Sequence, residues 1–540
     1  MQLDGAPPAT DAAGSVDAPA PGEIVAGQVL PVCGWALLGG RAPSLVEVHV
    51  DGHGPVRART RLPRDDVAEV HPGHRDAPVS GFEALIPLDV PPGTERAVSF
   101  RVRCRTEGAG EWTTAPRTVT LRNPAGDPDD VELAETLAAG TARALARVEV
   151  CTDPRHLLVC THSLGFGGAQ LWLHELLSRL VTAHGWRVSL VSESDGPLRR
   201  DCARLGIPVH VTSNYRTAGV ADYEGHVAEL GHLARCSGAG VALANTLGAF
   251  VAADAAKRAG LPTVLAIHES FALADFARQA YGPVPRPPAV WARWLSTLAE
   301  VDRLLFVADA TRELFLPYSK PERCRTVRYG SPLWTLGGRT EPGKRERVRA
   351  ALGYRAADVV LVSVGVAEPR KGFGPLISAF ERVHRLHEEV RLSIVGVPDS
   401  RYGRALAAGV RRAGLGEVVR LVPIQRDPID WVRAADVFVN CSDVESLPRS
   451  ILEAVCCGVP VAATDVFGAR EMIADGVSGW LFEPNDVDAL IAVLLRAVET
   501  QAADRRELAE AAHRALAGWL DPAGYAREYD AILAELTREG

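Results

Sequence analysis

The chain has 540 residues, more than one hydrophobic core normally serves, so we expect two to four domains. Charged residues make up 23% of it, the formal net charge is −8 and the sequence pI is about 6.0, which argues against a nucleic-acid-binding protein. Residues 1–22 lack the basic start and apolar stretch of a signal peptide, and no apolar run reaches membrane-spanning length. We therefore expect a cytoplasmic protein, with peripheral contact at a membrane left open.

The N-terminal part of the chain indicates a small β-domain. Residues 1–20 are rich in Ala, Pro and Asp and are predicted to be disordered. In residues 21–123, short β-rich runs alternate with Gly/Pro turns, which predicts an antiparallel β-sandwich, with an immunoglobulin-like arrangement as one form of it. The predicted strands are Glu23–Val29, Leu45–Val50, Phe82–Ile86, Val98–Cys104 and Arg117–Leu121. Because no catalytic cluster occurs here, we expect an accessory module that docks a partner or a glycan.

The rest of the chain alternates apolar strands with helices. Residues 124–152 read as a linker followed by an Ala-rich helix. The pattern then predicts one Rossmann-like domain over residues 153–336 and a second over residues 337–515, each with a doubly wound parallel sheet and with a cleft between the two. A last helix within residues 516–540 is expected to pack across the pair. The 10 cysteines show no metal-type pairing and are interpreted as reduced thiols, Cys33 and Cys104 included.

The most informative stretch is SDVESLPRSILEAVCCGVPVAATDVFG, residues 442–468. Its two carboxylates, Glu445 and Glu453, stand eight residues apart, on either side of Pro448. Pro448 suits the first turn of a helix, which would run from Arg449 to about Cys457. Glu445 would then lie on the loop and Glu453 inside the helix, while N–H groups at the helix start point at any anion. The order of loop carboxylate, helix N-terminus and helix carboxylate matches a ligand that carries a sugar, a diphosphate and a ribose in a row.

Three other stretches are candidates for ligand contact. Gly167 and Gly168, in THSLGFGGAQLWL, would let backbone N–H groups approach a phosphate or sugar, although a tight turn without ligand explains them equally well. His268 ends a predicted strand, where ligands of open α/β sheets gather, but a lone His there is more often structural. Arg370 and Lys371 follow the first strand of the second Rossmann-like domain. They suit a diphosphate, and a solvated charged loop is the alternative.

One motif suggests a metal and is set aside. Asp486 and Asp488 have the DxD spacing of metal-dependent sugar transferases. They open a predicted helix, Val487–Val498, where Asp is an ordinary capping residue. We therefore expect no metal and no cofactor.

Residues 359–485, with VSVGVAEPRKGF, LSIVG and the E-x7-E motif at Glu445 and Glu453, resemble the nucleotide-binding half of glycosyltransferase family 4. THSLGFGGAQ and IHES resemble its other half. The resemblance implies the GT-B fold, a nucleoside diphosphate sugar as donor, and transfer with retention and without an essential metal. The resemblance implies that Glu445 binds the donor-sugar hydroxyls, that Glu453 binds the ribose and that Lys371 binds the diphosphate. It implies backbone contacts to sugar or phosphate at Ser446, Leu447 and Pro448, and contacts to the donor phosphates at Gly167 and Gly168. It also implies that His268 lies near the reacting carbon. Val366 stands where many relatives have Arg, and Arg370 is the candidate substitute.

These observations predict transfer of a hexosyl group to a carbohydrate, lipid-linked or other hydroxyl acceptor in glycan or polysaccharide biosynthesis. Lys371 and Arg370 would stabilise the charge that grows on the leaving diphosphate. A catalytically silent scaffold or a carbohydrate-binding assembly protein is the alternative. A glycoside hydrolase would also use two carboxylates, but it would not need the basic diphosphate turn.

Overall fold

The computed structural model describes residues 12–106, 110–146, 152–212, 219–282, 286–335 and 343–539. The gaps fall within all six predicted segments: residues 1–11, 107–109, 147–151, 213–218, 283–285, 336–342 and 540 lie outside these ranges. The chain divides into two compact units. The first contains Met1–Pro91, Glu95–Asn123 and Leu333–Gly518, and the second contains Pro92–Thr94, Pro124–Pro332 and Trp519–Gly540.

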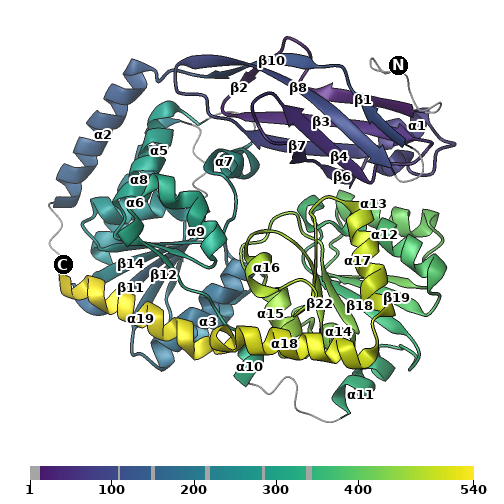
Figure 1. Ribbon diagram of the computed structural model, residues 1–540. Coiled ribbons are helices and arrows are strands. Elements are labelled where there is room, and N and C mark those ends of the chain that lie inside the picture. The colour runs from purple at the N-terminus through teal and green to yellow at the C-terminus, as the bar shows by residue number, and fades with distance from the viewer. Residues whose placement is uncertain are drawn as a thin grey trace. The chain divides into compact units, whose positions relative to one another are not determined.

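The N-terminal β-domain belongs to the first unit and consists of two sheets that share one apolar core (Figure 1). One sheet has the order β1-β3-β7-β6, from Ala12–Ala18, Val29–Leu38, Gly81–Pro87 and Arg59–Leu62. The other has the order β2-β10-β8-β4-β5, with β9 on β8, from Ile24–Ala26, Arg117–Asn123, Thr94–Thr106, Leu45–Val50, Val56–Arg57 and Gly110–Thr113. Short helices α1, Asp65–Val70, and η1, Ala77–Val79, connect β6 to β7. The two-sheet architecture agrees with the predicted sandwich, while its immunoglobulin-like character stays a prediction.

Two expectations for this domain are corrected. Residues 12–18 are not disordered: they form β1, which pairs antiparallel with β3, and Val16 on β1 is buried in the shared core. The sandwich is not wholly antiparallel, because β2 pairs parallel with β10. Strands so far apart in sequence need no tight turn, which removes the usual constraint toward antiparallel pairing. The sandwich forms one compact unit with the second Rossmann-like domain, and its role as an accessory module stays a prediction.

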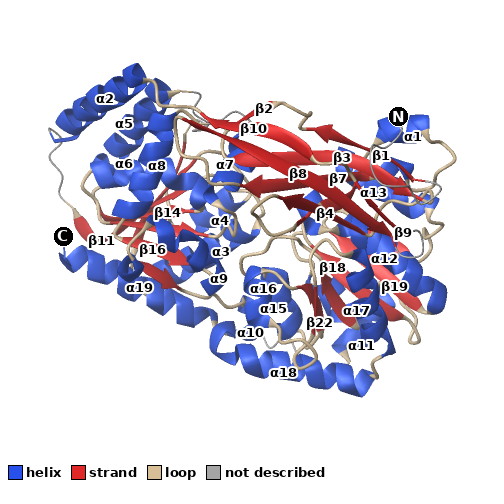
Figure 2. Ribbon diagram, turned by 45° about the horizontal axis from the view of Figure 1, so that its top comes forward, coloured by secondary structure: helices blue, strands red, loops and turns tan. Residues whose placement is uncertain are grey.

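The second Rossmann-like domain is a parallel sheet with helices around it (Figure 2). The strand order is β20-β19-β18-β21-β22-β23, from Val419–Val422, Val390–Val395, Val359–Val364, Val437–Asn440, Val461–Thr464 and Trp480–Phe482. Its helices are α11 to α18: Lys344–Ala351, Phe373–Leu386, Arg401–Arg412, Ile429–Ala434, Arg449–Cys456, Phe467–Met472, Val487–Glu499 and Ala502–Leu520. The order reverses between β18 and β21, and such a switch point is where open α/β sheets bind ligands.

The second unit contains the other Rossmann-like sheet, with the order β13-β12-β11-β14-β15-β16-β17. These strands are Val209–Val211, Arg187–Ser192, Asp153–Thr161, Ala239–Asn245, Thr263–Ile267, Arg303–Phe306 and Cys324–Thr326. Its helices α2 to α9 are Pro128–Ala146, Gly168–Thr182, Leu198–Arg204, Val220–Cys236, Phe250–Arg258, Leu273–Tyr281, Pro288–Glu300 and Asp309–Phe315. Here the switch point lies between β11 and β14.

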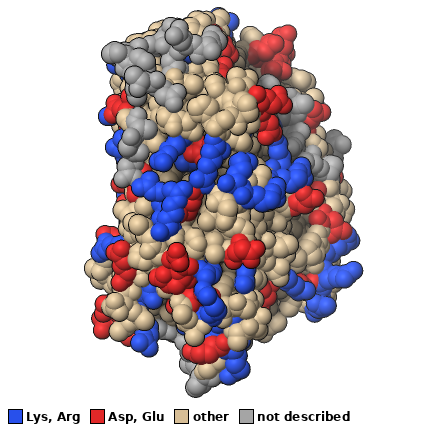
Figure 3. Space-filling model, turned by 90° about the vertical axis from the view of Figure 1, so that its right-hand side faces the viewer, with Lys and Arg blue, Asp and Glu red and all other residues tan. Residues whose placement is uncertain are grey.

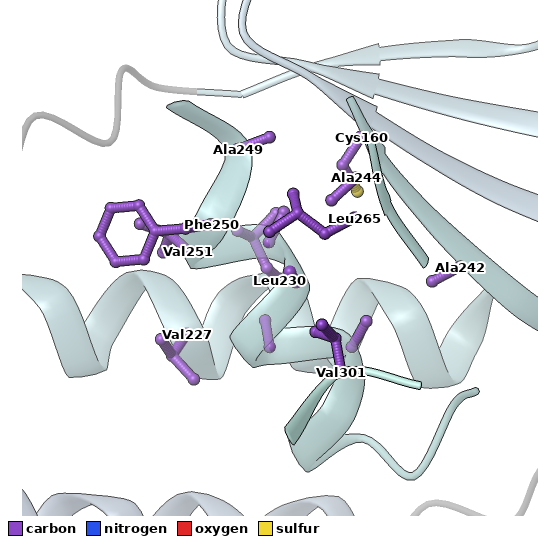
Figure 4. Packing of buried hydrophobic residues seen from close by; sticks show 14 of the residues in the cluster. Cys160, Val227, Leu230, Ala242, Ala244, Ala249, Phe250, Val251, Leu265 and Val301 are labelled. Atoms are coloured by element: carbon purple, nitrogen blue, oxygen red, sulfur yellow. The ribbon is translucent and has the colours of Figure 1, made fainter. Parts of the chain in front are cut away.

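The core of this unit gathers where α6 crosses the sheet (Figure 4). Five of the nine residues of α6 are buried alanines or valines, so the helix can approach the strands closely. Phe250, at its start, stacks on Trp294 of α8 with ring centroids 4.4 Å apart and on Tyr223 of α5 at 5.9 Å. Aromatic stacking of this kind adds about 0.5–1.5 kcal/mol per pair beyond the area buried.

The chain returns to the second unit through α19, Pro522–Glu539, which contacts α3, β11 and β14. Tyr525 and Tyr529 of this helix lie against Trp172 of α3. Among the helices of the described ranges, none combines the length and apolar composition that a membrane crossing requires. The nine cysteines in those ranges are free thiols, including Cys33 and Cys104.

Candidate functional site

Two loops meet at the switch point of the second Rossmann-like sheet. The first follows β18 and contains the 3₁₀ turn η5, Pro369–Lys371; the second follows β21 and leads into α15. The backbone N–H of Asp443 donates to the carbonyl of Arg370 at 2.9 Å, which joins the loops. Gly372 has φ 68°, and a Cβ there would lie 2.1 Å from the carbonyl oxygen of Cys441. Only glycine therefore allows the two loops to pack this closely.

Glu445 and Lys371, predicted from separate motifs, form an ion pair across these loops. The Ser442 hydroxyl donates to the same carboxylate oxygen, Oε1, at 2.8 Å. The two side chains are only 13% and 16% exposed. Burial raises the pKa of Glu445, but the charges of Lys371 and Arg370 and the hydrogen bonds outweigh it, so the pKa lies below its usual value. Glu445 is thus ionised at neutral pH, beside a cation.

Arg370 lies on the same turn as Lys371 and is more exposed. Its Nε donates to Glu368 Oε2 at 3.0 Å, which uses one of five guanidinium N–H groups. Val366, at the position where the family resemblance implies Arg in many members, is 38% exposed. The basic charge of this turn therefore comes from Arg370 and Lys371.

Helix α15 begins and ends close to its predicted limits. Pro448 is its N-cap residue, and Gly458, with φ 73°, follows its end. Glu453 pairs with Arg449 one turn earlier, with Nε to Oε1 at 2.8 Å. Ser446, Leu447 and Pro448 are buried as whole residues.

In the second unit, His268 follows β15 and is partly buried. Its Nε2 lies 3.0 Å from Asn245 Oδ1, which can only accept, so Nε2 carries the proton. The rings of Trp172 and His268 pack in an edge-to-face arrangement, with centroids 4.5 Å apart. Burial, followed by the charge of nearby His162, lowers the pKa of His268 to about 3. His268 is therefore a neutral imidazole at physiological pH.

His162 and Gln170 form a second polar chain that the motif analysis did not single out. Gln170 Nε2 lies 2.8 Å from His162 Nε2, and His162 Nδ1 lies 2.9 Å from Thr246 Oγ1. Since an amide nitrogen only donates, His162 accepts at Nε2 and donates from Nδ1. Thr246 has φ 80°, a strained conformation for a β-branched residue that is found mainly at functional sites. A His directly after a predicted strand was the available signal.

The two predicted glycines lie at the start of α3. Gly167 is the N-cap residue, and a Cβ there would lie 2.3 Å from Gln170 Oε1. Gly168 is exposed, with open space where a Cβ would stand. Backbone N–H groups at this helix start can therefore be approached, as an anion would require.

Glu269 is a further titratable group in this region. Its Oε2 accepts hydrogen bonds from the backbone N–H of Leu247 at 2.9 Å and of His268 at 3.0 Å. Burial raises its pKa to about 7, although these bonds act in the opposite direction. Through these two hydrogen bonds, Glu269 fixes the backbone at Leu247 and His268.

The DxD motif is a helix cap. Asp486 Oδ1 accepts from the N–H groups of Asp488 and Ala489 at 3.1 and 3.0 Å, as the capping interpretation predicted. Asp488 accepts from the Ser44 hydroxyl at 2.7 Å. Within the described part of the chain, no three His, Cys, Asp or Glu side chains are grouped so as to share a metal ion.

Two family descriptions match the chain: "Glycosyl transferase 4-like domain" over residues 167–330 and "Glycosyl transferases group 1" over residues 344–515. D-inositol 3-phosphate glycosyltransferase 1 of Catenulispora acidiphila is 31% identical over 297 residues, which cover 53% of this chain and 68% of that protein. The chain belongs to the group 1 glycosyltransferases. A Geodermatophilus obscurus relative, named D-inositol 3-phosphate glycosyltransferase, is 34% identical over 287 residues. The aligned residues make up 50% of this chain and 60% of the relative, so this chain spans less than two thirds of the relative's length.

The fold is GT-B. The solved structure of Anabaena HepE in complex with UDP-glucose matches with a TM-score of 0.60, covering 70% of this glycosyltransferase and 99% of HepE at 22% identity. WaaG, described as a glycosyltransferase involved in lipopolysaccharide biosynthesis, matches with a TM-score of 0.56 at 22% identity, over 70% and 99% of the two chains. Neither family range includes the N-terminal sandwich.

Proposed function

We propose that this glycosyltransferase moves a hexosyl group from a nucleoside diphosphate sugar to a hydroxyl acceptor, with retention and without a metal, in glycan or polysaccharide biosynthesis. The observation that carries the proposal is the Lys371–Glu445 pair at the switch point of the second Rossmann-like sheet. A cation suited to a diphosphate and an anion suited to sugar hydroxyls are held side by side there, and Glu445 is ionised at neutral pH.

The chemistry follows from these charges. When the bond between the sugar and the diphosphate breaks, its electron pair goes to the leaving phosphate oxygen. Lys371 would meet this charge as a point cation, and Arg370 would add a planar fork of N–H donors. This supplies the electrostatic work that a metal ion does in other transferases.

Each remaining residue has a proposed place. Glu445 would orient the sugar hydroxyls, Glu453 would bind the ribose, and the starts of α15 and α3 would offer N–H groups to the phosphates. His268 is proposed to lie near the reacting carbon. Because its imidazole is neutral, it would add no positive charge that opposes positive charge growing on the sugar.

The names of the relatives suggest which substrates to try. HepE was solved with UDP-glucose, so UDP-glucose is the first donor to test. The Catenulispora relative is named for D-inositol 3-phosphate, which is therefore the first acceptor to test.

The test is a panel of UDP-, GDP-, ADP- and dTDP-glucose, read by thermal unfolding and by mass spectrometry of the products. A donor at 100 times its Kd should add about 2.7 kcal/mol to the free energy of unfolding. We expect one nucleotide series to stabilise the protein and to give transfer that survives EDTA. Activity lost in EDTA and restored by Mn²⁺ would contradict metal independence. Donor binding without any product would favour the silent scaffold, and sugar release without nucleotide would favour a hydrolase.

A further inference from the structure

Strand β6 of the N-terminal sandwich lies against the donor loops of the second Rossmann-like domain. It contacts η5, which carries Arg370 and Lys371, and the start of α12 (Figure 1). The packing at α12 is close: a Cβ on Gly374 would lie 3.1 Å from Arg61 Cβ. The sandwich therefore meets the same turn that is proposed to bind the diphosphate.

One side chain of β6 reaches the second donor loop. Arg59 Nε bonds Asp443 Oδ2, and Asp443 stands two residues before Glu445. The pair is largely removed from water, with 18% of the Arg59 side chain and 9% of the Asp443 side chain exposed. Glu83, the cross-strand neighbour of Arg59 on β7, lies 3.9 Å from its guanidinium and adds a second, weaker attraction.

Asp443 is an anion between two cations. Burial raises the pKa of this carboxyl above its usual value, and the charges of Arg59 and then Arg370 offset only part of that rise. Its second oxygen, Oδ1, is buried and has no hydrogen-bond partner among the residues that the structure describes. If Arg59 were removed, the nearby cation left to compensate Asp443 would be Arg370, which is proposed to bind the donor diphosphate.

We propose that Arg59 is a positioning residue of the donor site: it compensates Asp443, holds the loop that carries Ser442 and Glu445, and leaves Arg370 available to the diphosphate. This role rests on the proposed function. Through Arg59, the sandwich would help to position the nucleotide-sugar site. The described contacts of Arg59 are with Asp443 and Glu83, so its effect on Lys371 and Glu445 is indirect.

The chain offers a matched control in Arg57. It lies two residues from Arg59 on the same segment and also bonds the second Rossmann-like domain, with Nη1 to Glu483 Oε2 at 2.8 Å. Glu483 is 59% exposed and follows β23, outside both donor loops. Loss of Arg57 thus removes one contact between the same two domains without unbalancing a buried charge.

The experiment compares Arg59→Met, Arg57→Met, Asp443→Asn and the double variant Arg59→Met/Asp443→Asn in the full chain. Calorimetry measures the Kd of UDP, or of the nucleoside diphosphate that the panel selects, and steady-state assays give KM and kcat for its glucose conjugate. We expect Arg59→Met to raise Kd and KM about tenfold and Arg57→Met to change them less than about twofold. The double variant should recover most of the loss, because no buried charge is left uncompensated.

Several outcomes would overturn the role. Equal Kd and KM for Arg59→Met and Arg57→Met would do so, as would a double variant in which the two losses simply add. If Arg59→Met fails to fold, Asp443→Asn carries the test: it leaves the largely buried Arg59 guanidinium without its carboxylate partner and should raise KM, and an unchanged KM overturns the role. A wild-type protein that binds no nucleotide at all would instead overturn the proposed function.

Discussion

At the residue scale, the two glutamates of the E-x7-E motif have different partners and should have different effects. Glu445 pairs with Lys371 across two loops, whereas Glu453 pairs with Arg449 on its own helix. We expect Glu445→Ala to lower kcat while leaving the Kd of the free nucleoside diphosphate almost unchanged. Glu453→Ala should weaken that nucleotide by about 1.5–3 kcal/mol, the cost of a lost charge-assisted hydrogen bond. Calorimetry with nucleotide and with intact donor measures both, after circular dichroism confirms folding. Equal weakening of the free nucleotide by both variants would refute these roles.

Glu269 should make the stability of the protein depend on pH. Burial raises its pKa from 4.5 to about 7, so the folded state favours the protonated form. The stabilising contribution of this group is therefore complete below pH 4.5 and is lost as the pH rises through 7. Glu269→Gln keeps an oxygen that can accept from Leu247 and His268 but removes the titration. In urea unfolding at pH 5, 6, 7 and 8, the free energy of unfolding of the variant minus that of wild type should increase with pH. A constant difference would show that Glu269 does not titrate in this range.

Some residues of the site could be predicted from the sequence, and others could not. Glu445, Lys371 and His268 belong to short motifs that follow predicted strands. The residue type indicates the chemistry, and the strand end indicates the position in the fold, so these residues could be predicted. Arg59 and Asp443 are separated by 384 positions, and neither belongs to a spacing pattern, so only the fold brings them together. The Lys371–Glu445 bond is an intermediate case: both residues were predicted, but their direct contact depends on β18 and β21 being neighbours.

At the element scale, α17 tests whether Asp486 is a cap or a metal ligand. Asp486→Ala removes an acceptor for two N–H groups and should lower the free energy of unfolding by about 1 kcal/mol. Asp504→Ala, at an exposed position in the first turn of α18, is the control and should stay within about 0.5 kcal/mol. Both values come from urea unfolding. Transfer by Asp486→Ala should be as insensitive to EDTA as transfer by wild type; loss of a Mn²⁺ requirement in the variant would restore the metal interpretation.

Strands buried on both faces were predictable, and irregular strands were not. β18, Val359–Val364, and β21, Val437–Asn440, are short, mainly apolar runs, because parallel strands covered by helices need no polar alternation. β3 was missed because Pro31 and Gly34 resemble turn signals, yet most of its side chains are buried. The edge strand β17 has three residues, too few for any periodicity. Strand order was beyond sequence patterns, because it is decided by which faces the connecting helices must cover.

At the scale of the whole molecule, the place of the sandwich changes what the chain is expected to do. The sequence predicted a separable module, since residues 124–130 are polar and the sandwich has its own core. Its contacts with the second Rossmann-like domain are instead numerous and partly buried. The backbone carbonyl of Ser44 accepts a hydrogen bond from the N–H of Val487 at the start of α17, and Arg75 pairs with Glu381 of α12 at 2.6 Å.

Figure 3 shows Lys and Arg side chains in a band on one face of the molecule, with Asp and Glu beside them.

A cut in the connecting segment distinguishes an integral domain from a separable one. A protease site inserted between Asn123 and Pro128 would be cleaved in the folded protein, leaving the sandwich attached only by non-covalent contacts. We expect the two fragments to co-elute in size-exclusion chromatography at 0.15 M NaCl and the nicked protein to keep its nucleotide affinity. At 1 M NaCl the screening length falls from about 8 to about 3 Å, so the ionic part of the contact should weaken and some sandwich should be released. The remainder should then bind nucleotide less well, because Asp443 has lost Arg59. Fragments that separate at 0.15 M NaCl without any loss of nucleotide affinity would show that the sandwich is the accessory module that its sequence first suggested.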